Sequence, residues 1–246
     1  MLHGLYSSAL AMDSAVRQQE VIAHNLAHAN MPGYRRAQLL HGTFDDTFVE
    51  TQHQLAVRSS QGLRGLHAAT DWQPGNMKST GRTLDVAIEG DGYFEIESPH
   101  GLRYTRNGSF ELNDQGQLVT HDGLPVMGLD GSIRIDPEVS KQTLSISPHG
   151  IVTIGSQQVG QLKIVEIENK YQLTAVGVTL FKPSADAHVT ELDPHVRAGY
   201  LEQANVQPVQ ELVELIATQR RHEAAARALH SIMQSIEKRT NLQGGN

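Results

Sequence analysis

The chain has 246 residues, with 27 acidic and 20 basic side chains and a formal net charge of −7. The two signs are intermixed, so the sequence lacks both the basic footprint of a nucleic-acid-binding protein and a polybasic patch for a membrane surface. The absence of cysteine excludes disulfides, thiolate nucleophiles and zinc–thiolate centres. No apolar run reaches the about 18 residues that suggest a transmembrane helix, so we expect no membrane insertion.

The first predicted element is a helix over residues 1–30. Its apolar residues are spaced, whereas those of a cleaved signal peptide are contiguous, so we expect any export to use another route. Asn30, Pro32 and Gly33 predict the end of the helix, because the residue before a proline avoids the helical region. Steps of three and four residues, the spacing of a coiled-coil seam, join Leu5, Ala9, Met12, Val16, Gln19, Ala23 and Leu26.

Two histidines near the end of this helix raise the question of a metal site. His24 and His28 lie one helical turn apart on one face. No third ligand accompanies them, and the intervening turn has no glutamate of the metalloprotease pattern. We therefore predict no metal centre, but two solvated histidines beside a helix C-terminus.

Residues 31–75 form the predicted connector, an extended arm. The stretch is rich in Gln, His, Ser and Thr, and no hydrophobic period persists along it. A long connector of this kind is either functional or flexible. Trp72, the only tryptophan, is predicted to anchor the connector by packing.

The period changes to two in the next segment, residues 76–192. Short alternating runs such as residues 84–88, 93–98 and 109–113 are each bounded by glycine, Asp or Asn turn signals. This pattern predicts a central antiparallel all-β domain, resembling a sandwich or a barrel.

A return arm over residues 193–206 leads into a second long helix, residues 207–246. Pro208 stands near the expected helix start, where its missing N–H costs nothing. The same three–four alternation joins Leu212, Leu215, Gln219, His222, Ala226, Leu229, Met233 and Ile236. The predicted fold class is therefore α+β, with the two terminal helices pairing as a coiled-coil layer and extended arms joining them to the β domain.

Polar side chains interrupt both seams, so each helix needs neighbours. Gln19 lies in the first seam, and Gln219 and His222 lie in the second. The periodicity allows two interpretations: an intramolecular hairpin that joins the two ends, or a pair of assembly elements.

The sequence contains no pattern that predicts catalysis or a cofactor. Residues 90–92, Gly-Asp-Gly, lie between strands and do not open a helix, so they are a turn and not a dinucleotide fingerprint. Glu95, Glu97 and Glu111 alternate along strands, and Asp114 follows in a turn. An acid pair of the glycosidase type is one interpretation of these carboxylates, and the solvent face of a sheet is the more common one.

Three stretches resemble the signatures of the flagellar basal-body rod and hook proteins. Residues 25–34 are similar to the N-terminal signature, and residues 81–94 with 104–110 are similar to the central β signature. Residues 199–206, with 211–213 and 219–221, are similar to the C-terminal signature. The chain departs from the pattern at Met31 and His222. The residues that carry the resemblance are Asn25, Asn30, Pro32, Gly33, Tyr34, Asp85, Gly90, Gly92, Asn107, Gly108 and Asn205.

The resemblance implies a non-enzymatic structural subunit of the flagellar rod, which polymerises helically through its terminal helices into a hollow axial drive shaft. It implies export by the flagellar export apparatus without a cleaved signal peptide, a place in the periplasmic rod, and other rod and hook proteins as partners. The subunit interface expected on this basis contains Leu5, Met12, Val16, Leu26, Leu212, Leu215, Leu229, Met233 and Ile236.

The subtype and two other functions stay open at this point. Residues 193–197 favour the proximal-rod member of the family, and residues 199–206 favour the distal-rod member. The alternatives are a cell-wall-acting enzyme built on the β domain, and a soluble export adaptor whose terminal helices pair within one chain.

Overall fold

The computed structural model describes residues 2–41, 66–135 and 144–243. The chain forms two compact units, and residues 31–75 are divided between them. The first, called here the helical unit, comprises Met1–Ala27, Arg36–Asp71 and Val206–Asn246. The second, called here the β unit, comprises His28–Arg35 and Trp72–Asn205. Residues 42–65 of the expected connector lie outside the described part.

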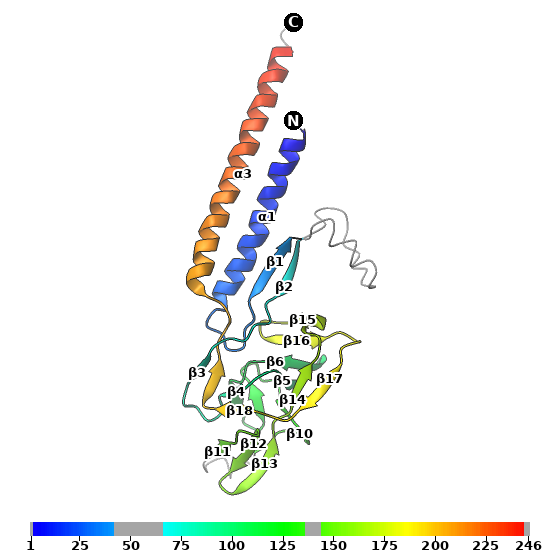
Figure 1. Cartoon of the computed structure of the whole chain (residues 1–246), viewed down its shortest axis with the longest axis vertical. Coiled ribbons are helices and arrows are strands. Elements are labelled where there is room, and N and C mark those ends of the chain that lie inside the picture. The colour runs from blue at the N-terminus through cyan, green and yellow to red at the C-terminus, as the bar shows by residue number, and fades with distance from the viewer. Residues whose placement is uncertain (1, 42–65, 136–143, 244–246) are drawn as a thin grey trace. The chain divides into compact units, whose positions relative to one another are not determined.

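Two terminal helices, α1 (Leu2–Ala27) and α3 (Pro208–Gln243), lie side by side in the helical unit. They run in opposite directions, so the first residues of α1 lie along the C-terminal half of α3 (Figure 1). The two helices confirm the predicted class, whereas the coiled-coil geometry of their pairing stays a prediction. None of the helices in the described ranges is both long and apolar enough to cross a membrane.

The ends of these helices follow from proline placement. α3 begins at Pro208, as predicted, because proline is favoured in the first helical turn. α1 ends at Ala27, three residues before the predicted end at Asn30. The chain forms a turn over residues 28–30, in which the Met31 amide donates to the carbonyl of His28 at 2.9 Å. Pro32, which follows, prevents another helical turn. The sequence therefore predicted the cause of the helix end correctly, but placed that end three residues too far along the chain.

A two-stranded antiparallel sheet completes the described part of the helical unit. β1 (Ala37–His41) pairs antiparallel with β2 (Leu66–Thr70), with Ala37 opposite Thr70. β1 lies against α1 (Figure 1). Residues 37–41 and 66–70 of the expected arm are therefore paired strands.

The β unit contains one 3-10 turn, η1 (Lys170–Gln172), and short strands whose pairs are all antiparallel in the described ranges, which confirms the predicted sheet type. The strands are β3 (Met77–Ser79), β4 (Val86–Ile88), β5 (Tyr93–Ser98), β6 (Gly101–Thr105), β7 (Phe110–Leu112), β8 (Leu118–Thr120), β9 (Met127–Gly128), β10 (Gly131–Ser132), β11 (Leu144–Ile146), β12 (Ile151–Ile154), β13 (Gln157–Gln161), β14 (Ile164–Ile167), β15 (Leu173–Ala175), β16 (Leu180–Pro183), β17 (Val189–Leu192), β18 (Val196–Ala198) and β19 (Tyr200–Glu202).

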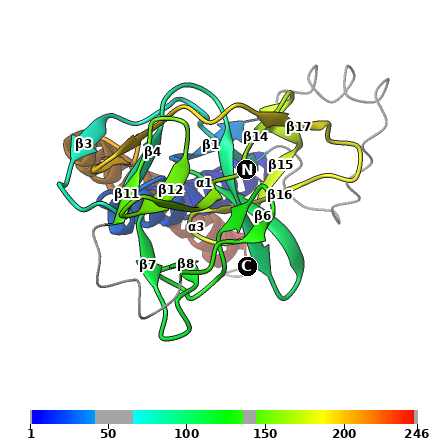
Figure 2. The same ribbon diagram turned by 90° about the horizontal axis from the view of Figure 1, so that it is seen from below.

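A six-stranded sheet in the order β15-β16-β6-β5-β14-β17 is the largest element of the β unit. Its β14 and β17 lie side by side in both views (Figures 1 and 2). A three-stranded sheet joins β11, β12 and β13, and two-stranded ladders pair β7 with β8, β9 with β10, β4 with β18 and β3 with β19. The strands of the return arm, β18 and β19, therefore pair with strands from the start of the unit.

Apolar clusters contact both faces of the six-stranded sheet. Along β5, Phe94 and Ile96 belong to the larger cluster, and Tyr93 belongs to the smaller one. Successive side chains of a strand point to opposite faces, so a strand covered on both faces is apolar at consecutive positions. Trp72 packs on the smaller cluster, with its ring centre 5.0 Å from that of Phe181, which confirms its predicted packing role.

Candidate functional site

The face of α1 that is buried against its surroundings is displaced from the predicted seam. Ala15, Ile22 and Asn25 are the buried residues of α1, and a Cβ on Gly4 would lie 3.3 Å from Ile232 of α3. These positions again follow a three–four spacing, but the predicted seam residue Val16 is 40% exposed. The other proposed interface residues of α1 are half-buried: Leu5, Met12 and Leu26.

The buried positions of α3 are polar. Glu211 and Thr218 are almost fully buried, whereas the predicted interface residues Leu212 and Met233 are about half exposed. Leu215, Leu229 and Ile236 are half-buried. The buried and half-buried positions of α3 therefore include both polar and apolar residues. Some large apolar residues of α3 lie on its exposed surface instead.

A stripe of exposed apolar side chains, called here the α3 stripe, lies on the first two turns of α3. Val209, Leu212, Val213 and Ile216 are 74%, 49%, 63% and 54% exposed. Their spacing of three and four residues places them on one face of the helix. Three of them, Val209, Val213 and Ile216, were not among the predicted interface residues. Their three–four spacing is visible in the sequence, but it runs beside the predicted seam that contains Leu212 and Leu215.

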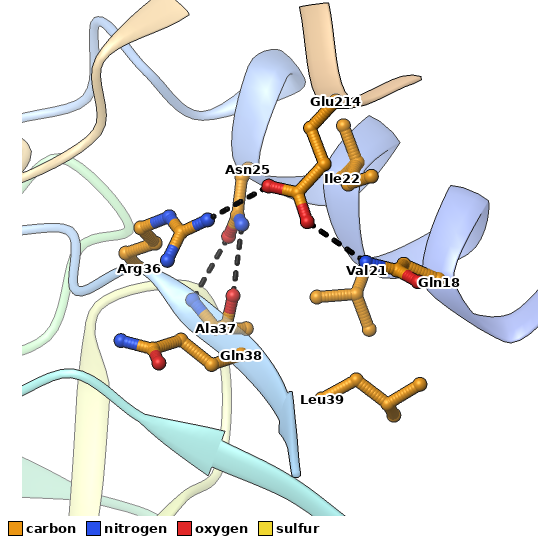
Figure 3. Close-up of a pocket in the computed structure, with 9 residues that line it drawn as sticks. All are labelled: Gln18, Val21, Ile22, Asn25, Arg36, Ala37, Gln38, Leu39 and Glu214. Carbon is orange, nitrogen blue, oxygen red and sulfur yellow. Dashed lines mark hydrogen bonds and ion pairs between the residues drawn. The ribbon is translucent and has the colours of Figure 1, made fainter. Parts of the chain in front are cut away.

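A polar network holds the base of the helix pair to β1 (Figure 3). Arg36 Nε lies 2.5 Å from Glu211 Oε1, and Arg36 Nη2 lies 3.5 Å from Glu214 Oε2. Gln18 Nε2 donates to Glu214 Oε1 at 2.8 Å. Gln18, Arg36 and Glu214 border a cavity of about 120 Å³ that is lined by residues of α1, α3 and β1.

Asn25 is the centre of this network. Its Nδ2 donates to the Ala37 carbonyl at 2.9 Å, and the Ala37 amide donates to its Oδ1 at 2.9 Å. The same Nδ2 lies 3.3 Å from Glu211 Oε2. This fully buried side-chain amide pairs with both the amide and the carbonyl of Ala37, which explains why a motif residue stands at this position.

The other N-terminal motif residues form a tight turn in the β unit. The Gly33 amide donates to the carbonyl of Glu202 at 2.8 Å. Gly33 has φ +70°, and a Cβ there would lie 2.3 Å from the amide nitrogen of Asn107. Tyr34 is buried, with its ring centre 5.4 Å from that of His28. Asn30 and Pro32 precede this contact and form the turn that leads into it.

A buried charge cluster lies beside this turn. Glu202 Oε1 is 2.6 Å from Arg35 Nη1, and Glu202 Oε2 is 3.3 Å from Arg106 Nη1. Glu202 Oε1 also accepts from the Gly75 amide at 2.9 Å. Burial lowers the pKa of Arg106 from its ordinary value, and Glu202 partly opposes that shift. Sequence reasoning missed this cluster, because nothing local relates residues so distant in the chain.

The central motif residues shape the start of the β unit. A Cβ on Gly108 would lie 1.7 Å from the carbonyl oxygen of Val86, so only glycine fits there. Asn107 Oδ1 accepts from the Ser109 amide at 3.0 Å, and the carbonyl of buried Asp85 accepts from the Gly199 amide at 2.7 Å.

The remaining motif residues also have backbone roles. Gly90 and Gly92 both have positive φ, and the carbonyl of Gly90 accepts from Arg106 Nη2 at 2.8 Å. Asn205 Nδ2 donates to the carbonyl of Gln73 at 3.0 Å. The motif residues thus make turns and close contacts in this structure.

The carboxylates considered for catalysis do not form an acid pair. Glu95 is buried and lies 3.0 Å from Lys163 Nζ, while Glu111 is exposed beside His121. Glu97 and Asp114 are exposed. In the described part of the chain no three metal-ligating side chains come together, at His24 and His28 or elsewhere.

Comparison with known proteins connects these features to one family. The model of the flagellar hook protein FlgE/F/G D1 domain matches residues 87–154, and that of the flagellar basal body rod FlgEFG protein C-terminal region matches residues 197–242. The basal-body rod protein FlgF of Salmonella typhimurium is 34% identical, over 94% of this chain and 94% of its own length. FlgG of Agrobacterium fabrum is 34% identical over 93% and 94%, and FlgG of Bacillus subtilis is 30% identical over 99% and 100%.

Proposed function

This chain belongs to the family of flagellar basal-body rod proteins, and from that premise we propose that it polymerises through its terminal helices into the axial shaft of the rod. It is a structural subunit of the bacterial flagellar basal body, and it assembles with other rod and hook proteins. Export by the flagellar apparatus without a cleaved signal, and a periplasmic place for the shaft, are parts of this proposal.

The α3 stripe is the observation that carries the proposal. One side of α3 already contacts α1, yet Val209, Leu212, Val213 and Ile216 stay exposed on the first turns of the same helix. Burying a fully exposed side chain of this kind contributes roughly 1.5–3 kcal/mol, and a neighbouring copy that covers these partly exposed side chains gains a share of that for each. Val16 of α1 and Met233 near the far end of α3 are further apolar side chains that stay about half exposed.

We assign the axial contacts to the two terminal helices, residues 1–30 and 207–246, and the body of the subunit to residues 76–192. Residues 31–75 and 193–206 are the arms in this assignment. The predicted interface residues Leu5, Leu26, Leu215, Leu229 and Ile236 are half-buried. They serve both the helix pair and the contact between copies in this proposal.

The alternative functions have no support. An enzyme would need paired acids in a cleft, whereas Glu95 is buried in an ion pair with Lys163. The adaptor hypothesis rested on helix pairing within one chain, and a rod subunit equally accommodates that pairing. The proposed role is non-enzymatic and requires no cofactor.

The test is a charge in the α3 stripe. Ile216→Asp should bury an unpaired carboxylate in the contact between copies and weaken assembly by several kcal/mol. Purified protein would be followed by sedimentation during polymerisation, and motility of the mutant strain would be scored. Glu223→Asp, on the exposed surface of the same helix, is the control. Assembly and motility that match the wild type in Ile216→Asp would overturn the proposal.

A further inference from the structure

Two histidines of the β unit face each other outside every feature described so far. His149 and His195 are both exposed. Their ring centres are 5.9 Å apart, with the ring planes inclined by 52°. Neither residue is one of the residues that carry the three family signatures, although His195 lies in the stretch 193–197 that favours the proximal-rod member, and neither is part of the α3 stripe.

The backbone brings these two side chains together. The Val196 amide donates to the carbonyl of Pro148 at 2.8 Å, so the residues next to each histidine are directly hydrogen-bonded. The carbonyl of His195 accepts from the Glu89 amide at 2.8 Å. The position of His195 is therefore set from two sides.

The segment that carries His149 is held equally closely. Its carbonyl accepts from Gln161 Nε2 at 3.0 Å. Gly150 has φ +69°, and a Cβ there would lie 2.9 Å from the Cβ of Pro194, so glycine permits the close approach of the two segments. Backbone contacts therefore fix the positions of the two histidines, and only the rotation of their side chains is left for a bound ion to fix.

Two imidazoles at this separation suit one transition-metal ion. Because a Zn–N bond is about 2.0–2.1 Å long, two imidazoles on one ion have ring centres roughly 4.5–6.5 Å apart. Neutral imidazole binds Zn²⁺, Ni²⁺ and Cu²⁺ well. Exposure of both rings leaves the other coordination positions to water.

We propose that His149 and His195 form a two-histidine surface site for a divalent transition-metal ion, with Zn²⁺, Ni²⁺ and Cu²⁺ as the class of ligand. The ion joins residues 147–150 to residues 193–196 and so stabilises the fold of the β unit. Binding to the folded chain alone raises the free energy of unfolding with metal concentration.

The experiment titrates untagged full-length protein with NiCl₂ in an isothermal titration calorimeter. Wild-type protein should bind one ion at this site, and His149→Ala and His195→Ala should each weaken that binding at least about tenfold, since one imidazole remains. His100→Ala and His121→Ala, which remove other exposed histidines of the β unit, are matched controls and should bind as the wild type does.

A second measurement keeps the proposal falsifiable if other histidines also bind the ion. Nickel should raise the midpoint of thermal unfolding of the wild type and of both controls, and this shift should disappear in the double variant His149→Ala/His195→Ala. An equal shift in the double variant, or equal loss of affinity in His121→Ala, would overturn the proposal.

Discussion

Glu202 forms ion pairs with two guanidinium groups inside the β unit. Arg35 arrives from the turn after α1, Arg106 from the end of β6, and Glu202 from β19. Transfer of a charge out of water costs several kcal/mol unless it is paired and hydrogen-bonded. A single carboxylate therefore decides whether three distant segments can be buried together.

Glu202→Gln should destabilise the β unit by about 3 kcal/mol, because it leaves two buried cations without their partner. Trp72 lies in this unit and is the only tryptophan, so its fluorescence during urea unfolding reports on the β unit. Glu89→Gln removes the exposed partner of Arg197 and should cost no more than about 1 kcal/mol. Equal costs for the two variants would contradict the role assigned to Glu202.

Two buried tyrosines predict a loss of stability at alkaline pH. Burial raises the pKa of Tyr93 and of Tyr104 above the ordinary 10.0, and Glu95 adds to the shift of Tyr104. Both groups bind their protons more tightly when folded, so their contribution is complete below about pH 10 and is lost as the pH rises through the folded pKa.

In the Tyr93→Phe variant, the free energy of unfolding should therefore decrease less steeply above about pH 10 than in the wild type. The phenylalanine ring keeps the contact with Arg106. Urea midpoints measured at several alkaline pH values would show this effect. Tyr171→Phe, which changes a tyrosine that is 88% exposed, is the control. A wild-type-like pH profile in Tyr93→Phe would refute the assignment.

At the scale of elements, consecutive arginines serve different parts of the molecule. Arg35 pairs with Glu202 in the β unit, and Arg36 pairs with Glu211 and Glu214 of α3 in the helical unit. Within the helical unit, polar contacts around Asn25 join α1, α3 and β1. Polar contacts of this kind fix which residues of the three elements lie opposite one another, more than they add to the free energy of unfolding.

Asn25→Asp should loosen this junction. The change keeps the side-chain shape but removes the donor to Ala37 and places a second carboxylate beside Glu211. We expect a loss of about 2–4 kcal/mol in the helical unit, seen as an earlier transition in circular dichroism at the helix band. Asn30→Asp makes the same chemical change at an exposed position and should have little effect.

At the scale of the whole molecule, the proposed function predicts that the helical unit depends on assembly more than the β unit does. Among the α1 residues whose burial is described, only Ala15, Ile22 and Asn25 are buried, so α1 contributes few fully buried apolar side chains. The β unit has two buried apolar clusters. The free energy of unfolding should therefore differ between the two units.

Limited proteolysis of a dilute monomer should remove the terminal helices first and leave a core of about residues 70–200. Polymerisation should protect the helices, because copies then cover the α3 stripe. Mass spectrometry of the fragments before and after assembly measures both effects. Helices that resist protease equally in the monomer would contradict assembly-coupled ordering.

Much of the architecture follows from local signals in the amino-acid sequence. Three–four spacing, Pro208 and the turn before Gly33 determine two terminal helices, and period-two runs with glycine turns determine the antiparallel strands. Each of these signals acts within a few residues, because helix capping and turn geometry are local. The family motifs were likewise readable, since Gly33 and Gly108 occupy positions where a Cβ would collide with backbone.

Only the tertiary structure decided which residues meet. It buried Glu211 and Thr218 and left Val213 and Ile216 exposed, although all four lie on one helix. It also joined Arg35, Arg106 and Glu202, and placed His149 beside His195. Periodicity identifies the apolar face of a helix but not the element that covers this face, because the covering element depends on how the whole chain packs. Ion pairs between distant segments likewise depend on that packing, so no local pattern in the sequence indicates them.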